Sequence, residues 1–237
     1  MSELEMMEAL KKFDTPTITN VLATYPGDKE LCLGLYNPWT VDWYTDQTLK
    51  CVYPELGRRV GYAVTAVYTL PDPAFDRLGF VDVLRAVEEM PKPVIVVIKQ
   101  DMPEEIKRKN GLSGGNMTTA FKTLGCVGCI SDGPSRDIDE IRGIDFQYML
   151  TGVCAGHGSF SVSAVNVPVS VCGMDVCSGD IIHMDENGAV RFPAKLLPRV
   201  LELCEKLQAL EEKKMADIAR CKTAEEIAYV MSGGAYK

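Results

Sequence analysis

The alternation of apolar strand patterns and helix patterns between residues 93 and 140 constrains the fold most. The run 93–99 (PVIVVIK) is continuously apolar, which is typical of a strand buried on both faces. A helical pattern follows from about Met117 to Leu124, then an apolar run at 126–131 (CVGCIS), then a helix expected to open at Arg136-Asp137. Strand, helix, strand and helix in this order predict a right-handed parallel βαβ unit and an α/β fold.

Further elements are expected on both sides of this unit. Helices are predicted at 3–13, at about 16–24, at 80–89 and from 194 to about 219, and strands at 60–68, 165–171 and 180–185. The chain contains no internal repeat and no long Gly/Ser/Pro linker. We therefore expect one domain over residues 1–237, with N-terminal helices (about 3–24), an aromatic-rich irregular segment (about 34–57) and a helical tail (about 194–237).

The charge of the chain excludes several classes of partner. Among 237 residues, 25 Lys and Arg stand against 33 Asp and Glu, for a formal charge of −8. No basic excess exists to neutralise phosphates, so neither nucleic acid nor an anionic membrane surface is an expected partner. The start of the chain lacks a secretory signal pattern, and no apolar run reaches the ~18–20 residues of a membrane span. We expect a cytoplasmic protein.

Nine cysteines are present, and their odd number without an export signal predicts reduced thiols. Cys126 and Cys129 form a CxxC motif. Their neighbours favour a buried strand, in which cysteine behaves as a small apolar residue. A redox or zinc role is the alternative.

Two loops of the βαβ unit carry the residues with chemical potential. In such a unit the loops that leave the carboxyl ends of the strands lie side by side and bind ligands. The first loop, GLSGGN (111–116), leads into a helix whose free N–H groups and positive dipole end attract an anion. The second loop brings Arg136, which can pair with a carboxylate, and Asp137, which can ligate a divalent cation. Together they predict a site for a small anionic 2-oxo acid held on Mg²⁺.

The same residues have a plainer interpretation. An Arg-Asp pair at a helix start is most often a cap beside a solvated charge, and a Gly-rich loop before a helix is commonly a turn. The glycine spacing is not that of a dinucleotide-binding motif, and no Lys-Ser or Lys-Thr follows as in a P-loop. From the residues alone, the anion site is a hypothesis.

Four segments sharpen this hypothesis, at residues 14–22, 57–66, 114–141 and 165–190. They resemble the RraA-like family, which contains the class II 4-hydroxy-4-methyl-2-oxoglutarate/4-carboxy-4-hydroxy-2-oxoadipate aldolases and the regulators of ribonuclease E activity. The resemblance implies an α-β-β-α sandwich of the swivelling β/β/α type. It also implies a homotrimer or homohexamer with the site at a subunit interface.

The resemblance also implies roles for individual residues. Arg136 and Asp137 match a catalytic Arg-Asp pair in which the Arg contacts pyruvate and its enolate and the Asp ligates Mg²⁺ (or Mn²⁺). Asn116 and Met117 match two positions whose amides hold the pyruvate carboxylate. The substrate-binding residues expected on this basis are Gly114, Gly115, Asn116, Met117 and Arg136.

One position departs from the pattern of these aldolases. They carry an acidic residue twenty intervening residues before the Arg-Asp pair, and Gly115 stands at that position here. Asn116 and Asp132 are candidates to replace the missing carboxylate. A Glu from the C-terminal helix of a neighbouring subunit assists the metal site in the aldolases, which makes Glu211 and Glu212 candidates for that role.

The resemblance predicts a divalent-metal-dependent lyase that cleaves a C–C bond in a small 2-oxo acid. Retro-aldol release of pyruvate and decarboxylation of oxaloacetate would share a metal-stabilised enolate. Gly115 favours the alternative of a non-catalytic RraA-like binding or regulatory protein. The aromatic segment leaves open a related lyase or dehydratase acting on a sugar acid.

A few other residues are expected to lie in or near the site or to serve the fold. His157, in a glycine-flanked loop, is expected either to line the site or to serve the loop or an interface, and His183 is expected to be structural. Arg58 and Arg59 are expected to be solvated. Trp39 and Trp43 either cover the pocket or pack between subunits.

Overall fold

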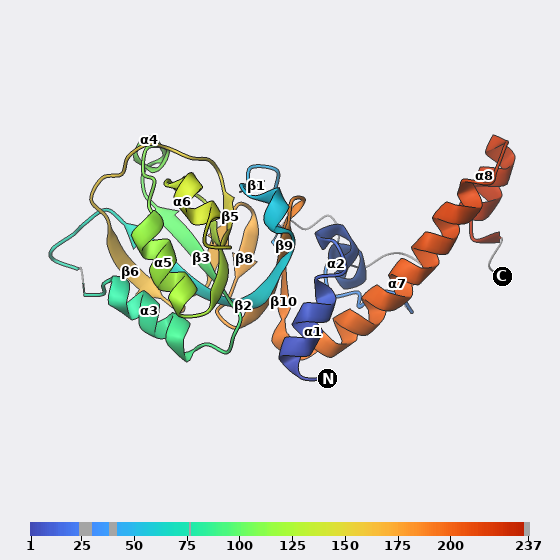
Figure 1. The fold of residues 1–237 in the computed structure, drawn as a ribbon, viewed down its shortest axis with the longest axis horizontal. Coiled ribbons are helices and arrows are strands. Elements are labelled where there is room, and N and C mark those ends of the chain that lie inside the picture. Colours follow the sequence, from blue (N-terminus) through green and yellow to red (C-terminus); the bar gives the residue numbers. More distant parts are fainter. Residues whose placement is uncertain (24–29, 38–41, 76, 235–237) are drawn as a thin grey trace.

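The structure is a computed structural model that describes residues 1–23, 30–37, 42–75 and 77–234. It contains an eight-stranded sheet in the order β1-β5-β4-β3-β2-β9-β10, with β6 paired to β2, and a two-stranded sheet of β7 and β8 (Figure 1). The strands are β1 (Lys50–Cys51), β2 (Arg59–Thr69), β3 (Val94–Asp101), β4 (Cys126–Ser131), β5 (Gln147–Leu150), β6 (Ser161–Val165), β7 (Val169–Val171), β8 (Met174–Val176), β9 (Asp180–Asp185) and β10 (Gly188–Pro193). The helices are α1 (Glu3–Leu10), α2 (Thr15–Leu22), α3 (Phe80–Glu89), α4 (Glu104–Lys107), α5 (Gly115–Thr123), α6 (Ile138–Arg142), α7 (Leu197–Ile218) and α8 (Ala224–Met231), with short 3₁₀ turns at Pro54–Leu56 and Ala194–Leu196.

Strands β2, β3, β4 and β5 run parallel, which confirms the parallel pairing predicted for the strands at 93–99 and 126–131 and extends it to β2 and β5. Helix α5 connects β3 to β4, and α6 connects β4 to β5. The loops before α5 and α6 therefore lie at the carboxyl edge of these parallel strands, where the sequence places the site.

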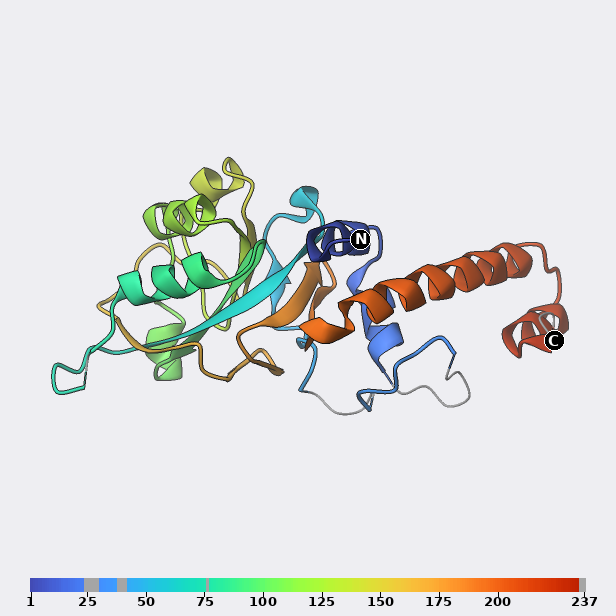
Figure 2. The same cartoon turned by 90° about the horizontal axis from the view of Figure 1, so that it is seen from below.

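Side chains alternate between the two faces of the parallel strands. One face packs against α3, α5 and α6, and the opposite face packs against β7 and β8. A third apolar cluster joins α1, α2 and α7 to β9 and β10. The result is a layered α/β fold with α5 and α6 at one end of the molecule and α7 at the other (Figures 1 and 2).

Helix α7 projects away from the sheet, and α8 lies at its far end (Figure 2). The buried residues of α7 all lie at or before Cys204, and its later turns are largely exposed. Within the described residues, no helix is long and apolar enough to cross a membrane.

Several element boundaries differ from the predicted ones. The strand expected at 165–171 is split into β6 and β7, because Asn166 has a φ of 57° that breaks the extended backbone. The helix expected to open at Arg136-Asp137 begins at Ile138, because Asp137 has a φ of 58°. The N-terminal helices end at Leu10 and Leu22, a few residues earlier than expected.

Trp39 lies outside the described residues. Trp43 is buried and stacks on Tyr36 with ring centroids 5.0 Å apart, within the cluster that includes α1, α2 and α7. The expectation that Trp43 covers a pocket or packs between subunits is therefore wrong, because its ring is part of the chain's own core.

Candidate functional site

The Gly-rich loop and the loop after β4 lie side by side, as predicted. The amide of Leu112 donates to the carbonyl of Pro134 (3.3 Å), and the amide of Arg136 donates to the carbonyl of Ser113 (3.2 Å). The loop after β5 joins them, since the amide of Ser135 donates to the carbonyl of Gly152 (3.2 Å). Backbone bonds thus fix three loops at the carboxyl edge of the sheet.

A buried cluster of hydroxyl groups lies under these loops. The Ser113 hydroxyl is 2.8 Å from that of Ser135 and 3.0 Å from that of Tyr148, which also contacts the Thr118 hydroxyl. Sequence reasoning missed this cluster. Its members come from two loops, one helix and one strand, so no local spacing indicates that they meet.

The side chain of Asp137 turns away from α6, the helix that it precedes. Its φ of 58° lies in the left-handed region, which Asp tolerates better than most residues. The carboxylate does not cap α6. Its Oδ2 instead accepts a hydrogen bond from the amide of Gly115 (3.0 Å) and lies 3.4 Å from Nε of Arg136. Arg136, Asp137 and the start of α5 therefore form one group.

Glycine at the start of α5 leaves room for the ends of three side chains that approach it. A Cβ on Gly114 would overlap Oδ2 of Asp137 and lie 3.1 Å from Nε of Arg136. A Cβ on Gly115 would overlap Oε2 of Glu140 and lie 3.9 Å from Oδ2 of Asp137. The two glycines thus form a cradle that contains Arg136, Asp137 and Glu140. Sequence reasoning missed Glu140, although its spacing of three residues from Asp137 at a helix start was a usable signal.

The start of α5 also presents backbone donors. Its first intrahelical bond is from the amide of Thr118 to the carbonyl of Gly114 (3.0 Å), so the amides of residues 115–117 have no intrahelical acceptor. Gly115 donates to Asp137. In the described part of the chain, the amides of Asn116 and Met117 have no acceptor. These two amides and the half-buried Arg136 guanidinium can together bind a carboxylate.

The residues present fit a hydrated divalent cation. Across the described residues, no group of three or more His, Cys, Asp and Glu side chains gathers as a metal cluster. Mg²⁺, however, keeps several waters and is usually held by one or two carboxylates. Asp137 uses one carboxylate oxygen for the Gly115 amide, and Glu140 brings a second carboxylate to the same cradle. Such a donor set suits Mg²⁺ or Mn²⁺.

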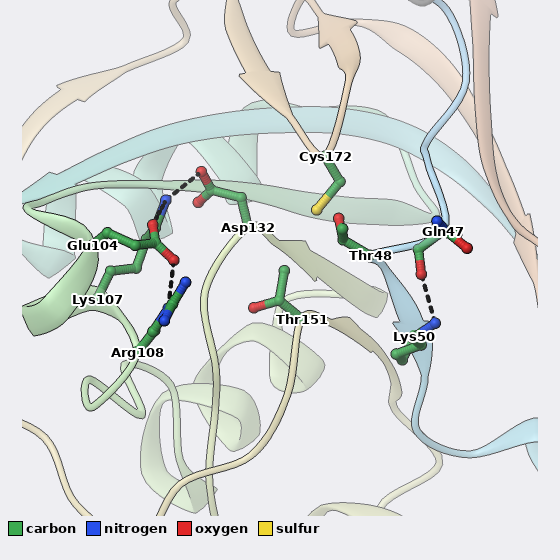
Figure 3. Close-up of a pocket in the computed structure, with 9 residues that line it drawn as sticks. All are labelled: Gln47, Thr48, Lys50, Glu104, Lys107, Arg108, Asp132, Thr151 and Cys172. Carbon is green, nitrogen blue, oxygen red and sulfur yellow. Dashed lines mark hydrogen bonds and ion pairs between the residues drawn. The ribbon is translucent and has the colours of Figure 1, made fainter.

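Asp132 lies in a different environment. Its Oδ2 is 2.7 Å from Nζ of Lys99 and 3.5 Å from Nζ of Lys107, and its Oδ1 accepts from the amide of Gln100 (2.7 Å). Figure 3 shows it at the wall of a cavity of about 670 Å³. The cavity is lined by Gln47, Thr48, Lys50, Glu104, Lys107, Arg108, Asp132, Thr151 and Cys172. Because two ammonium groups already neutralise its carboxylate, Asp132 is a poor replacement for the acidic residue missing at Gly115.

The other predicted residues lie outside the cradle. His157 is exposed, with Nδ1 2.9 Å from the carbonyl oxygen of Gly158. Glu211 and Glu212 line a cavity of about 210 Å³ beside Lys12 and Arg58, and burial raises the pKa of Glu211. This cavity lies at the α7 end of the molecule, opposite α5 and α6 (Figure 1). Within one chain, neither Glu reaches Arg136.

Arg58 and Arg59 are not simply solvated, which corrects the expectation. Arg58 donates to the carbonyls of Lys11 (3.2 Å) and Lys12 (2.7 Å), which follow α1. The Arg59 side chain is only 14% exposed and pairs with Asp145. Both side chains join separate parts of the fold.

All nine cysteines lie among the described residues, and none of them forms a disulfide there. Cys126 and Cys129 are buried in β4, and burial raises the pKa of both thiols, that of Cys126 to about 12. Protonated, buried thiols are poor metal ligands and poor nucleophiles. The structural interpretation of this CxxC motif is therefore the one that its surroundings favour.

Comparisons with known proteins agree with this fold. A family model described as RraA-like (Aldolase/RraA) matches residues 40–191. The solved structure of Streptomyces coelicolor RraAS2, described as an unusual member of the RNase ES inhibitor RraA protein family, superposes with a TM-score of 0.63. It is 18% identical and covers 92% of this chain and 96% of its own.

Two curated relatives match part of the chain. An uncharacterized protein of Methanocaldococcus jannaschii is 31% identical over 117 residues, which are 49% of this chain and 56% of that protein. A protein of Halalkalibacterium halodurans named as a putative 4-hydroxy-4-methyl-2-oxoglutarate aldolase is 29% identical over 133 residues, which are 56% of this chain and 61% of its own. Both matches span less than two thirds of the relatives' length.

The layered sheet with its paired loops places the chain among α/β proteins of the RraA fold. The family match covers more than half of its residues. The chain belongs to the RraA-like family, some of whose members are named as aldolases.

Proposed function

We propose that this protein is a divalent-metal-dependent lyase that cleaves a C–C bond in a small 2-oxo acid and releases pyruvate. The observation that carries the proposal is the start of α5. There, the acceptor-free amides of Asn116 and Met117 lie in the same group as Arg136 and Asp137. The name of the H. halodurans relative supports the same chemistry.

Each residue of this group has a defined task. The two amides and Arg136 bind the carboxylate of the 2-oxo acid. When the C3–C4 bond breaks, its electron pair forms a C2–C3 double bond and the carbonyl π pair moves onto the 2-oxo oxygen. The Arg136 guanidinium stabilises the negative charge of the resulting enolate. Protonation at C3 then gives pyruvate. A cation held by Asp137 would supply Lewis-acid polarisation of the 2-oxo group.

Two reactions share this route. In a retro-aldol cleavage of a 4-hydroxy-2-oxo acid, a base also removes the hydroxyl proton, and a second carbonyl compound leaves. In oxaloacetate decarboxylation CO₂ leaves directly, and no such base is needed. The decarboxylation therefore tests whether these residues bind the substrate and stabilise the enolate, without also requiring a base.

The proposal includes a homo-oligomer, a trimer or a hexamer. The family resemblance implies this assembly. The position of Glu211 and Glu212 is compatible with it, because α7 carries them away from Arg136 of their own chain. In an assembly these glutamates would act on a neighbouring subunit.

The test is pyruvate release from oxaloacetate and from 4-hydroxy-4-methyl-2-oxoglutarate, first with Mg²⁺ and then with EDTA. We expect EDTA to abolish release and Asp137→Asn to lower its rate on the order of 10²-fold. Asn tolerates the left-handed backbone at this position. The matched control is Asp139→Asn, whose side chain is 93% exposed, and we expect it to stay near the wild-type rate. Equal rates in Asp137→Asn and Asp139→Asn would contradict the proposal.

A non-catalytic binding protein is the second candidate, favoured by glycine at position 115 and by the description of RraAS2 as belonging to an inhibitor family. It predicts no pyruvate from the wild type and a gain of activity in Gly115→Asp. A wild type as fast as Gly115→Asp would eliminate it. A dehydratase acting on a sugar acid loses the support of Trp43, whose ring is buried in the core.

A further inference from the structure

We infer that Glu140 is the second carboxylate of the cation site and positions the cation beside Asp137. This inference rests on the proposed function, since it concerns the same site. It does not depend on which 2-oxo acid is cleaved.

The direction of the Glu140 side chain is the first observation. Glu140 is the third residue of α6, and a Glu at this place commonly bonds back to the amide that precedes its own helix. Among the described residues no such bond exists. Oε2 of Glu140 instead crosses to α5 and occupies the space that a side chain on Gly115 would fill.

The charge balance of the cradle is the second observation. Asp137 and Glu140 bring two carboxylates to Gly115, and the cradle holds one guanidinium, that of Arg136, which pairs with Asp137. The other nearby guanidinium, Arg142, pairs with Glu55 and Asp139. Glu140 has no ion pair or hydrogen bond within the described part of the chain. Two neighbouring carboxylates repel each other, and a cation between them removes that repulsion.

Glycine at position 115 leaves room for this arrangement. A side chain there would displace the Glu140 carboxylate, so the carboxylate that the cradle uses comes from α6 and not from α5. Glu140 acts as a positioning residue, because it holds the cation or its water and need not touch the substrate.

The test is Mn²⁺ binding by the full-length protein, measured by electron paramagnetic resonance without substrate. We expect Glu140→Gln to raise the Kd at least about tenfold, as loss of a supporting group around a metal typically does. The matched control is Asp139→Asn, at the residue of α6 directly before Glu140, and it should leave the Kd unchanged. The double variant Gly115→Asp/Glu140→Gln returns a carboxylate to the cradle and should recover most of the affinity.

The outcomes separate this inference from the lyase proposal. An unchanged Kd in Glu140→Gln overturns the inference even if the wild type releases pyruvate. A wild type that binds Mn²⁺ through Glu140 but releases no pyruvate leaves the inference standing and overturns the lyase. A wild type that binds no Mn²⁺ overturns both.

Discussion

Gly114 illustrates how a residue without a side chain shapes this site. A Cβ at this position would overlap the Asp137 carboxylate and lie 3.1 Å from Nε of Arg136. Its backbone has a φ of −128°, so the restriction comes from neighbours and not from the backbone. Close approach of Arg136 and Asp137 to the start of α5 thus depends on glycine.

We expect Gly114→Ala to lower metal-dependent pyruvate release by roughly 10²-fold, because small displacements of catalytic groups cost that much. The control is Gly152→Ala, since a Cβ there meets nothing within 4 Å. Steady-state rates and thermal unfolding of both variants give the measurement. Equal activity in the two alanine variants would show that the cradle does not need its glycine.

The sequence predicts the residues of the site whose role is local. Arg136, Asp137 and the glycines are candidates because their loops follow predicted parallel strands and because they match the pattern of the RraA-like family. Glu140 is not, because its role depends on which helix its side chain faces. The sequence leaves Asp132 as a possible substitute, because no pattern in it shows that Lys99 and Lys107 neutralise this carboxylate.

At the scale of elements, the hydroxyl cluster connects the loops to the sheet. The Tyr148 hydroxyl contacts Ser113 in the Gly-rich loop and Thr118 in α5. Tyr148 lies in β5, so its hydroxyl connects the Gly-rich loop and α5 to a strand of the core. A strand of the sheet thus helps to fix the position of residues that lie on loops.

Removing the hydroxyl of Tyr148 should therefore destabilise the fold. We expect Tyr148→Phe to lower the free energy of unfolding by about 1–3 kcal/mol, since buried partners lose a hydrogen bond. Tyr68→Phe is the matched control, because the buried Tyr68 hydroxyl has no partner among the described residues and its loss should be neutral or stabilising. Urea denaturation compares the two. A larger loss in Tyr68→Phe would refute this role of the cluster.

Most elements follow from the sequence for a simple reason. The buried parallel strand Val94–Asp101 contains a continuous apolar run, and the strands predicted at 126–131 and 180–185 have the bounds of β4 and β9. The sequence pattern does not show where a strand is interrupted by a single backbone angle, as it is by the positive φ of Asn166. The burial of Trp43 was also missed, since its partners come from both ends of the chain.

At the scale of the whole molecule, His183 links the N-terminal helices to the sheet. It lies fully buried in β9, and its Nδ1 is 2.9 Å from the hydroxyl of Thr15 at the start of α2. Burial lowers the pKa of His183 below the ordinary value near 6.5, and the opposing effect of Asp185 is smaller. Folding therefore favours the neutral imidazole.

This pKa shift makes stability depend on pH. As the pH falls below about 6.5, His183 gains a proton in the unfolded chain but not in the folded one, so stability falls by at most about 1.4 kcal/mol per pH unit. We expect His183→Gln to flatten the dependence of unfolding free energy on pH between 7.5 and 5.5. The only other histidine, His157, is exposed, and His157→Gln should keep the wild-type slope. Parallel curves for wild type and His183→Gln would contradict this.

On the proposed function, the start of α5 and the Arg136-Asp137 pair form one site for a 2-oxo acid and a cation. The most direct measurement is a crystal structure with Mn²⁺ and pyruvate, with the metal located by anomalous scattering. We predict Mn²⁺ beside Asp137 and the pyruvate carboxylate on the amides of Asn116 and Met117 and on Arg136. Pyruvate in the cavity beside Asp132 and Lys107, with no metal at Asp137, would show that the start of α5 is not the site.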